Sequence, residues 1–481
     1  MQAFTVTLLS VPAVLFGSTL ALAEAPNRSQ AEAALERACR FFHDHCSHHG
    51  GYVWRYSRDL TLSEGEAETG PDTAWVQPPG TPAVGETFLD AWEATGREEY
   101  RDWAIETARA LVRGQLQSGG WYYRIDFDEE ERKRWGFRDN EAYRPSRRRK
   151  NKTNVTTLDD DVTPAAVRLL MRVDRELDFS DREIHEAAMF ALDAIVAAQY
   201  PNGGWYQNWD RYPESASSND FPVIAASYPE SWSRRWLNDW PGRYFNNDNV
   251  SGNVIATLLE AWDTYQDERY LEAAKRGGEF LIRAQMPDPQ PAWAQQYDPQ
   301  MHPCWDRKFE PPAISGLESQ DVMETLMLLY RRTGEQRFLE PIPRALEYLK
   351  NSRYPDGRLA RFYELKSNRP LFFTKEYELT YNSDDSPTHY GFIVDSRLDA
   401  IEAEFTRLSR RGPEAQPTAS PSRRELAEQA AAVIEALDDR GAWIDPRSMK
   451  GHRKASPEGV VQSETFNTNA RVLCEYLQSL N

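Results

Sequence analysis

A short turn that recurs along the chain constrains its fold more than any other feature. Residues 199–205 are Gln-Tyr-Pro-Asn-Gly-Gly-Trp, and residues 115–121 are Gln-Leu-Gln-Ser-Gly-Gly-Trp. Shorter versions lie at 49–52, 354–357 and 439–443, and a Pro-rich version without glycine lies at 286–293. Glycine permits the positive-φ conformation that ends a helix, and the aromatic residue can then pack across the turn. The turns therefore predict where helices stop.

Apolar residues recur at helical spacing around each turn, as in residues 188–198. Gly51, Gly120 and Gly204 are 69 and 84 residues apart, which is too uneven for a short solenoid but suits helix pairs joined by long loops. The predicted helices are 30–45, 83–93, 100–116, 163–177, 182–198, 250–265, 270–284, 318–332, 338–350, 390–408, 423–437 and 465–480. We predict an all-α fold, an α/α toroid of about six helical hairpins with long loops forming a cleft at one face.

Three segments are distinguished by composition. Residues 1–23 are apolar, lack Lys and Arg, and end in Ala-Leu-Ala, which fits a signal peptide with an A-x-A cleavage site. We therefore expect a secreted or periplasmic protein. Residues 24–481 are predicted to form a single catalytic toroid domain. Within that domain, residues 411–422 are rich in Pro, Ser and Ala, which is typical of a flexible linker.

Composition excludes several classes of partner. The formal net charge of −18 disfavours nonspecific nucleic-acid binding, so an acidic ligand would need a local basic cleft or a metal. No run after residue 23 reaches the length of about 18 apolar residues that spans a membrane. The chain holds 15 Trp, 22 Tyr and 20 Phe, which fit either platforms for sugar rings or a large core. We expect a monomer that binds neither nucleic acid nor membrane.

Two stretches rich in Asp and Asn precede returning helices. Residues 156–164 are Thr-Thr-Leu-Asp-Asp-Asp-Val-Thr-Pro, and residues 244–251 are Tyr-Phe-Asn-Asn-Asp-Asn-Val-Ser. Ordinary helix capping explains one such residue in each stretch. Three consecutive aspartates exceed what a cap requires, because their charges repel one another. Clustered carboxylate and amide oxygens suit a hard cation, most naturally Ca²⁺, so we interpret these stretches as a metal site rather than caps alone.

Basic residues occupy the loops that follow. Arg307 and Lys308 form a basic pair in an aromatic, Pro-rich setting, and Arg361 and Lys375 lie in the next loop. A surface ion pair is the ordinary role of such residues. The basic run at 147–150 is typical of a solvated surface, although it could guide an acidic polymer. The sequence contains no Gly-rich phosphate loop, G-x-S-x-G or H-E-x-x-H motif.

Five motifs occur in order between about residues 114 and 385. They are residues 199–205, Phe-Asn-Asn-Asp-Asn at 245–249, Trp-Ala-Gln-Gln-Tyr-Asp at 293–298, Arg-Lys-Phe-Glu-Pro-Pro at 307–312 and Arg-Phe-Tyr-Glu-Leu at 361–365. Together, and in this order, they resemble the pectate lyases of polysaccharide lyase family 10. The Gly-Gly-Trp motif alone is a weak signal, whereas the set of five motifs is specific.

The resemblance implies an α/α toroid that cleaves polygalacturonate by β-elimination with Ca²⁺. On the matched positions, Arg307 would be the catalytic base that takes the C5 proton of a galacturonate. The predicted metal ligands are Asp159, Asp248 and Asp160. The predicted substrate-binding residues are Arg361, Lys375, Trp205 and Asn249. Arginine is normally protonated in proteins, so the role of Arg307 rests on the resemblance.

The chain departs from the family's pattern in three places. Residues 159–163 are Asp-Asp-Asp-Val-Thr, where an Asp-Asn-Gly-Ala-Thr-like stretch is usual. The loop from Asn208 to Tyr244 is longer and richer in Trp than expected. Lys375 stands where an arginine of an Arg-Asp pair is expected. These departures bear on the subsites and on which uronate is bound.

Three other functions compete with the lyase. A triterpene-cyclase-like enzyme shares the Q-x-x-x-G-x-W turns, but its chemistry needs an apolar cavity, whereas these loops are charged. A non-catalytic polysaccharide-binding protein would keep the aromatic residues and the metal. A glycoside hydrolase on the same ring would use a carboxylate pair such as Asp159 and Asp248. Only the lyase makes a 4,5-unsaturated uronide.

Overall fold

The computed structural model describes residues 25–144, 153–416, 421–451 and 459–481. The predicted signal peptide at 1–23 and the basic run at 147–150 lie outside the described residues, as does part of the predicted linker. Within the described part of that linker, Arg331 and Arg407 both donate hydrogen bonds to the Ala415 carbonyl. Residue 415 is thereby tied to the two preceding helices that carry these arginines. None of the described helices combines the length and apolar character needed to span a membrane.

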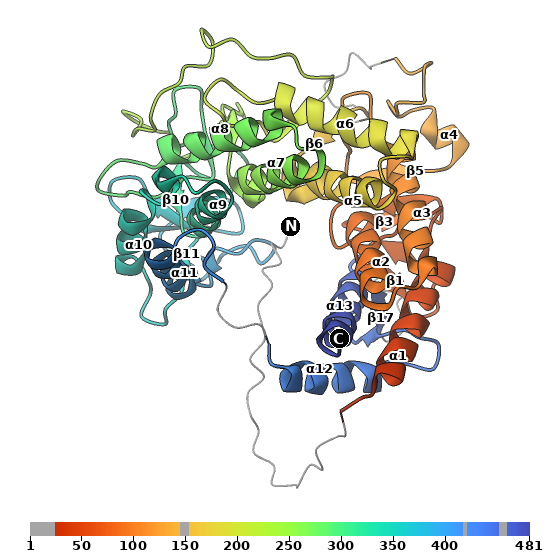
Figure 1. Ribbon diagram of the computed structural model, residues 1–481. Helices are drawn as coiled ribbons and strands as arrows, with labels where there is room; N and C mark the ends of the chain where they lie inside the picture. The colour runs from red at the N-terminus through yellow and green to blue at the C-terminus, as the bar shows by residue number, and fades with distance from the viewer. Residues whose placement is uncertain (1–24, 145–152, 417–420, 452–458) are drawn as a thin grey trace.

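In the part of the chain that the structure describes, twelve helices form the predicted six hairpins, so the fold is an α/α toroid (Figure 1). The outer helices are α1 (Arg28–Phe41), α3 (Glu98–Gly114), α6 (Arg182–Ala197), α8 (Glu268–Ala284), α10 (Ile342–Asn351) and α12 (Arg423–Glu435). The inner helices are α2 (Thr81–Thr95), α5 (Val162–Glu176), α7 (Val250–Tyr265), α9 (Glu318–Thr333), α11 (Leu398–Arg411) and α13 (Ser463–Ser479). The remaining helical segments are short: α4 (Glu129–Arg132), η1 (Phe42–Cys46), η2 (Asp159–Asp161), η3 (Asn247–Asn249) and η4 (Gln336–Phe338).

The recurring turn fastens each hairpin to itself and to its neighbour. Its aromatic residue is a clamp, because the indole N–H donates to a carbonyl of the preceding helix. These bonds are Trp121 to Leu111, Trp205 to Ile195, Trp293 to Leu281 and Trp443 to Val433. The Gln that opens the turn donates to the next outer helix or to the residue before it. These bonds are Gln115 to Ala187, Gln199 to Ala273 and Gln285 to Pro341.

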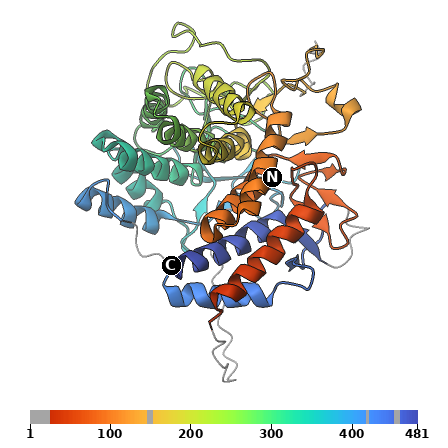
Figure 2. The same ribbon diagram turned by 45° about the vertical axis from the view of Figure 1, so that its right-hand side comes forward.

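The last hairpin joins the first. Arg37 on α1 donates to the Asp438 carbonyl at 2.5 Å, and a Cβ at Gly441 would lie 2.4 Å from the Arg37 carbonyl oxygen. Figure 2 shows α13 between α1 and α2, with α12 beside them. The turn of the last hairpin therefore contacts the first outer helix, which joins the two ends of the ring.

Short antiparallel strand pairs connect the loops. The pairs β6 (Thr156–Thr157) with β7 (Asn208–Trp209) and β8 (Tyr244–Phe245) with β9 (Gln296–Tyr297) link the loops of successive hairpins. A further sheet contains β10 (Ala313–Ser315), β12 (Phe362–Glu364), β13 (Pro370–Phe373) and β14 (Leu379–Thr380). The other strands are β1 (Arg55–Ser57), β2 (Ser63–Glu64), β3 (Glu68–Thr69), β4 (Thr73–Trp75), β5 (Arg124–Asp126), β11 (Leu359–Ala360), β15 (Ile393–Val394), β16 (Ile444–Asp445) and β17 (Val460–Gln462).

One helix prediction was wrong at its start. The sequence pattern predicted a helix over 390–408, but α11 begins at Leu398. Residues 390–397 are not helical, because Tyr390 and Phe392 pack into a second aromatic core with Phe309 and Phe362. Burial on this second core outweighs the helical spacing of the apolar residues.

The turn glycine gives the first prediction. Gly203 has φ +94°, and a Cβ there would lie 2.0 Å from the Arg276 carbonyl oxygen of α8. Gly203→Ala should lower the free energy of unfolding by about 3 kcal/mol, because it adds a backbone clash to the φ strain. Gly357→Ala is the matched control, since Gly357 has φ +87° but open space around its Cβ position. The control should lose about 1 kcal/mol in urea unfolding. Equal losses of unfolding free energy in the two variants would show that the turn at Gly203 does not pack closely against α8.

Candidate functional site

The two acidic stretches fold into the same turn. Each is a 3₁₀ segment that leads into an inner helix, η2 into α5 and η3 into α7. Asp160 and Asp161 have φ values of 49° and 62°, and Asp248 and Asn249 have φ values of 48° and 57°. Asp and Asn tolerate this left-handed conformation better than other residues with a Cβ. Asp160 and Asp248 therefore hold equivalent positions in two neighbouring hairpins.

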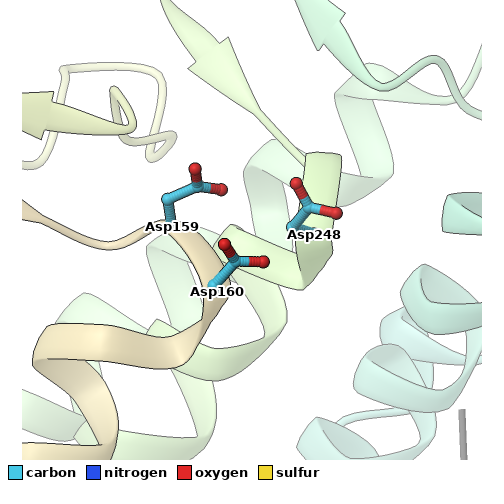
Figure 3. A group of neighbouring side chains, drawn as sticks. All are labelled: Asp159, Asp160 and Asp248. Atoms are coloured by element: carbon cyan, nitrogen blue, oxygen red, sulfur yellow. The ribbon is translucent and has the colours of Figure 1, made fainter. Parts of the chain in front are cut away.

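This repeated turn brings three carboxylates together. One oxygen from each of Asp159, Asp160 and Asp248 lies within 4.8 Å of the others. Figure 3 shows the three carboxylates gathered around one point. The Tyr123 hydroxyl donates to Asp159 Oδ2 at 2.8 Å and to Asp160 Oδ2 at 3.3 Å. Asn247 Nδ2 donates to Asp248 Oδ2 at 2.9 Å. These bonds orient the carboxylates but leave their charges uncompensated.

Burial and mutual repulsion disfavour the charged forms of these groups. Burial, together with the charge of Asp248, raises the pKa of Asp159 to about 7. Burial and the charge of Asp159 raise the pKa of Asp160 as well. Asp159 Oδ1 is buried and has no hydrogen-bond partner among the described residues. Three close carboxylates with an unsatisfied buried oxygen are the donor set that a divalent cation with oxygen ligands requires. The residues present therefore fit Ca²⁺.

Two guanidinium groups approach the same carboxylates. Arg307 Nη2 lies 3.4 Å from Asp248 Oδ2, and Arg361 Nη2 lies 3.9 Å from Asp248 Oδ1. Each arginine also has a buried glutamate as partner. Arg307 Nε donates to Glu310 at 2.6 Å, and Arg361 Nη2 donates to Glu318 at 2.7 Å. The two glutamates fix the guanidinium groups at one side of the acidic cluster.

A buried network keeps this side rigid. Gln295 Nε2 donates to Asn247 Oδ1 at 3.0 Å, to Glu318 Oε1 at 2.9 Å and to the Tyr390 hydroxyl at 3.1 Å. The Tyr390 hydroxyl donates to Glu310 Oε1 at 3.1 Å. The Tyr390 ring centre lies 4.4 Å from Arg361 Cζ. Since the network includes residues before α7, in α9 and before α11, it ties three hairpins to the site.

The electrostatics of Arg307 bear directly on its predicted role. Burial lowers its pKa, but the charges of Glu310 and Asp248 outweigh burial and hold the pKa well above its ordinary value. Without a bound cation the guanidinium is therefore protonated. A cation held by Asp248 would offset one of the two carboxylates that stabilise the protonated form. A bound cation would therefore lower the pKa of Arg307, and a base at this position needs a lower pKa.

The structure brings five of the predicted site residues into one place. Their charged groups come from the loops of four successive hairpins. They are Asp159, Asp160, Asp248, Arg307 and Arg361. Three carboxylates with two fixed guanidinium groups form a mixed-charge cluster whose chemistry suits an acidic ligand and a cation together.

The other three predicted site residues make contacts outside this cluster. Trp205 was predicted to bind substrate, and this is wrong: its side chain is 0% exposed and clamps its own turn. Lys375 has an exposed ammonium group 2.9 Å from Asp385, and no hydrogen bond or ion pair links it to the acidic cluster within the described residues. Asn249 adjoins Asp248, but its Nδ2 donates along α7 to Asn253. Its substrate role stays a prediction.

Sequence reasoning missed residues that shape the site. Gln295 and Glu310 lie inside the quoted motifs, so a signal for them was present. Tyr123 follows the Gly-Gly-Trp turn by two residues, where a polar aromatic could have been noticed. Tyr390 was hidden by the mistaken helix prediction. Glu318 begins α9 and has the ordinary pattern of a first-turn acid.

Comparison with known proteins gives a partial match. Residues 115–225 match the family model described as pectic acid lyase, which confirms the resemblance for that segment. No curated protein matches the chain. A family 10 polysaccharide lyase from Cellvibrio cellulosa, solved as a mutant in complex with trigalacturonic acid, is 17% identical with a TM-score of 0.44. It covers 69% of this chain and 98% of that chain.

Two sugar-acting enzymes show similar likeness. Cellobiose 2-epimerase from Bacillus thermoamylovorans is 14% identical with a TM-score of 0.49, covering 94% of this chain and 98% of that chain. An α-1,6-mannanase from Salegentibacter is 11% identical with a TM-score of 0.41, covering 94% and 99%. At TM-scores below 0.5 these structures carry no argument about the site. The family match supports a polysaccharide-processing enzyme.

The acidic cluster predicts an unusual stability profile. The folded protein retains the Asp159 proton up to about pH 7, whereas an unfolded aspartate loses it near pH 4 (about 3.9). The carboxyl group therefore favours folding below about pH 4, and this contribution is lost as the pH rises through 7. In chelator at pH 8, Asp159→Asn should raise the free energy of unfolding by about 2 kcal/mol, with little effect at pH 4.

The neighbouring aspartate provides the control. Asp161 is paired with Arg168 at 2.5 Å, and Arg168 also donates to Thr257 on α7. Asp161→Asn should therefore lower the free energy of unfolding at pH 8, by about 1 kcal/mol. Urea unfolding at both pH values measures the two variants. If both variants lose stability at pH 8, the conclusion that the three carboxylates repel one another is contradicted.

Proposed function

We propose that the protein is an exported pectate lyase that cleaves polygalacturonate by Ca²⁺-assisted β-elimination. The observation that carries the proposal is the contact between Asp248 and both guanidinium groups, on residues that match the motifs of that family. The match to pectic acid lyases over residues 115–225 supports the substrate class. Export rests on the signal-like segment at 1–23.

The proposed reaction sets demands on the site. A base removes the proton at C5 of a galacturonate, the C4–O bond breaks, and a C4–C5 double bond forms in the product. The departing glycosidic oxygen takes up a proton from solvent and becomes a hydroxyl of the other fragment, and the base later releases its own proton to solvent. The C5 proton is acidic only if negative charge can spread onto the adjacent carboxylate. Bound Ca²⁺ supplies a positive charge that stabilises this developing anion.

The residues of the chain then have separate roles. Asp159, Asp160 and Asp248 hold the cation. Arg361 is only 3% exposed and is paired with Glu318, so its role is to place positive charge behind Asp248, where it attracts a uronate carboxylate. Arg307 accepts the C5 proton, with its guanidinium plane set by Glu310. A base must stand within about 3 Å of the proton it takes, which demands this kind of fixed placement.

Local charge explains how an acidic protein receives an acidic polymer. The chain has a net charge of −18, so long-range attraction to polygalacturonate is absent. The two arginines and the bound cation provide positive charge only where uronates bind. We propose a monomer, since all proposed ligands come from one chain.

One observation favours a competing function, that of a glycoside hydrolase. Asp159 with a pKa of about 7 would retain a proton near neutral pH, as a glycoside hydrolase's general acid does. Its close approach to Asp160 and Asp248, however, leaves no gap for the water that an inverting pair needs, which is about 6.5 Å or more. Product chemistry separates the two, because only a lyase forms a double bond.

The lyase proposal predicts a defined product. Polygalacturonate with Ca²⁺ should yield 4,5-unsaturated oligogalacturonides that absorb in the ultraviolet, and a chelator should stop their formation. Arg307→Ala should lower kcat by about a thousandfold, because the base is lost. Saturated products with new reducing ends would instead identify a hydrolase.

Lys375→Ala is the matched control for an exposed cation in the loop that also carries Arg361. Its ammonium group is exposed and paired with Asp385, so we expect KM to change less than about twofold. A large rise in KM for this variant would restore Lys375 as a substrate-binding residue. Circular dichroism of both variants shows whether the fold is intact.

A further inference from the structure

The long Trp-rich loop concentrates the exposed apolar surface of the chain. Seven large apolar or aromatic side chains are exposed in the described residues, and five of them lie between residues 212 and 240. They are Tyr212, Val223, Ile224, Leu237 and Trp240. Exposed apolar groups gathered in one segment indicate a binding surface more often than chance exposure does. Nothing in the proposed reaction yet uses this loop.

The end of the loop is fixed to the segment that carries Arg307. Trp236 donates its indole N–H to the Asp306 carbonyl at 2.7 Å. In return, Trp305 donates its indole N–H to the Ser233 carbonyl at 2.8 Å. These two bonds cross between the segments just before Arg307. The residues around Trp236 are therefore continuous with the wall of the site.

Trp240 is held in an exposed position at some conformational cost. Its ring lies 5.6 Å from that of Trp236 at 88°, and its indole N–H donates to Asn238 Oδ1 at 2.9 Å. Trp240 and Asn238 have φ values of 48° and 58°. A tryptophan in this region costs roughly 1–2 kcal/mol, and such strain gathers at functional positions. Trp240 is 43% exposed and Leu237 is 64% exposed.

A cation accompanies the exposed ring. Arg235 is exposed, and its guanidinium makes no ion pair with any carboxylate in the described part of the chain. The adjacent Arg234, in contrast, pairs with Glu364. Most arginines of this acidic protein have carboxylate partners. An exposed aromatic ring, an exposed leucine and a guanidinium without such a partner suit a ring that has an apolar face and a carboxylate.

We propose that residues 235–240 form an additional sugar subsite, in which Trp240 and Leu237 pack against a uronate ring and Arg235 pairs with its carboxylate. The inference rests on the proposed function and extends it, because it names where a longer substrate gains affinity. The occupant is the polysaccharide itself, since the patch adjoins the Arg307 segment. A second copy of the chain is the competing occupant.

Affinity as a function of substrate length tests the subsite. Calorimetry gives the Kd of tri- to octagalacturonate for the Arg307→Ala protein in Ca²⁺, where no substrate is consumed. Affinity should rise when the oligomer becomes long enough to reach the patch. Trp240→Ala in that background should remove this rise, weakening the longest oligomer about five- to tenfold and the shortest not at all. Arg235→Ala should remove part of it.

Tyr212→Ala is the matched control. Tyr212 is exposed on the same loop, but its ring lies 4.9 Å from Phe190 of α6, away from the Arg307 segment. The control should retain the full length dependence. Equal losses in Tyr212→Ala and Trp240→Ala, or no loss in either, would overturn the subsite. So would sedimentation of the unmodified protein as a dimer that Trp240→Ala disperses.

The two proposals fail in distinguishable ways. Trp240-dependent binding without any unsaturated product would support the subsite and refute the lyase. If unsaturated product forms but Trp240→Ala changes neither the Kd nor the KM at any oligomer length, the lyase is supported and the subsite is refuted. Complete lack of oligogalacturonate binding would refute the subsite.

Discussion

Repulsion among three carboxylates is the constraint on which the site depends. Asp159, Asp160 and Asp248 are held within 4.8 Å of one another in partly buried positions, where their charges are poorly screened. Burial and this repulsion both raise the pKa of Asp159, so proton uptake relieves part of the energetic cost. A divalent cation would relieve more of it. Arg307 and Arg361 lie at the edge of the cluster, where Glu310 beside Arg307 and Glu318 beside Arg361, together with Asp248, hold the pKa of each guanidinium above its ordinary value.

The ring of hairpins makes this costly arrangement possible. The turns that contain Trp121, Trp205 and Trp293 each clamp their own helix through the indole N–H and the neighbouring hairpin through a glutamine amide. Successive inner helices therefore begin side by side, and identical left-handed turns at η2 and η3 bring their carboxylates together. The energy that offsets the repulsion comes from packing and hydrogen bonds distributed over several hairpins, so the site can remain strained without unfolding.

The helical spacing of apolar residues was enough to predict most of the fold. The predicted helix 250–265 coincides with α7, because the apolar spacing there is regular and no second core competes. The acidic pocket could also be predicted, since two similar stretches at equivalent places in a repeat must meet. Trp205 could not be placed in the site correctly from composition alone. Its recurrence in other turns was the better guide, because a residue needed in every hairpin is structural.

The other site residues that were placed wrongly or overlooked depend on contacts between loops that are distant in the sequence. Lys375 was assigned from its place in a motif order, but nothing in the sequence shows that Asp385 lies beside it. Tyr390 lies in a segment whose helical spacing is overridden by packing on Phe309 and Phe362. The crossed indole bonds between Trp236 and Trp305 and their carbonyl partners likewise depend on the folded loops. Local pattern determines helices, whereas these contacts depend on tertiary structure.

A crystal structure with Ca²⁺ and trigalacturonate would test the central claim most directly. We predict one ion bound by oxygens of Asp159, Asp160 and Asp248 at about 2.3–2.6 Å, which is the usual Ca²⁺ distance. We also predict a uronate carboxylate on that ion, with its C5 facing Arg307. An ion bound elsewhere in saturating Ca²⁺, or a sugar whose C5 faces away from the guanidinium, would contradict the account.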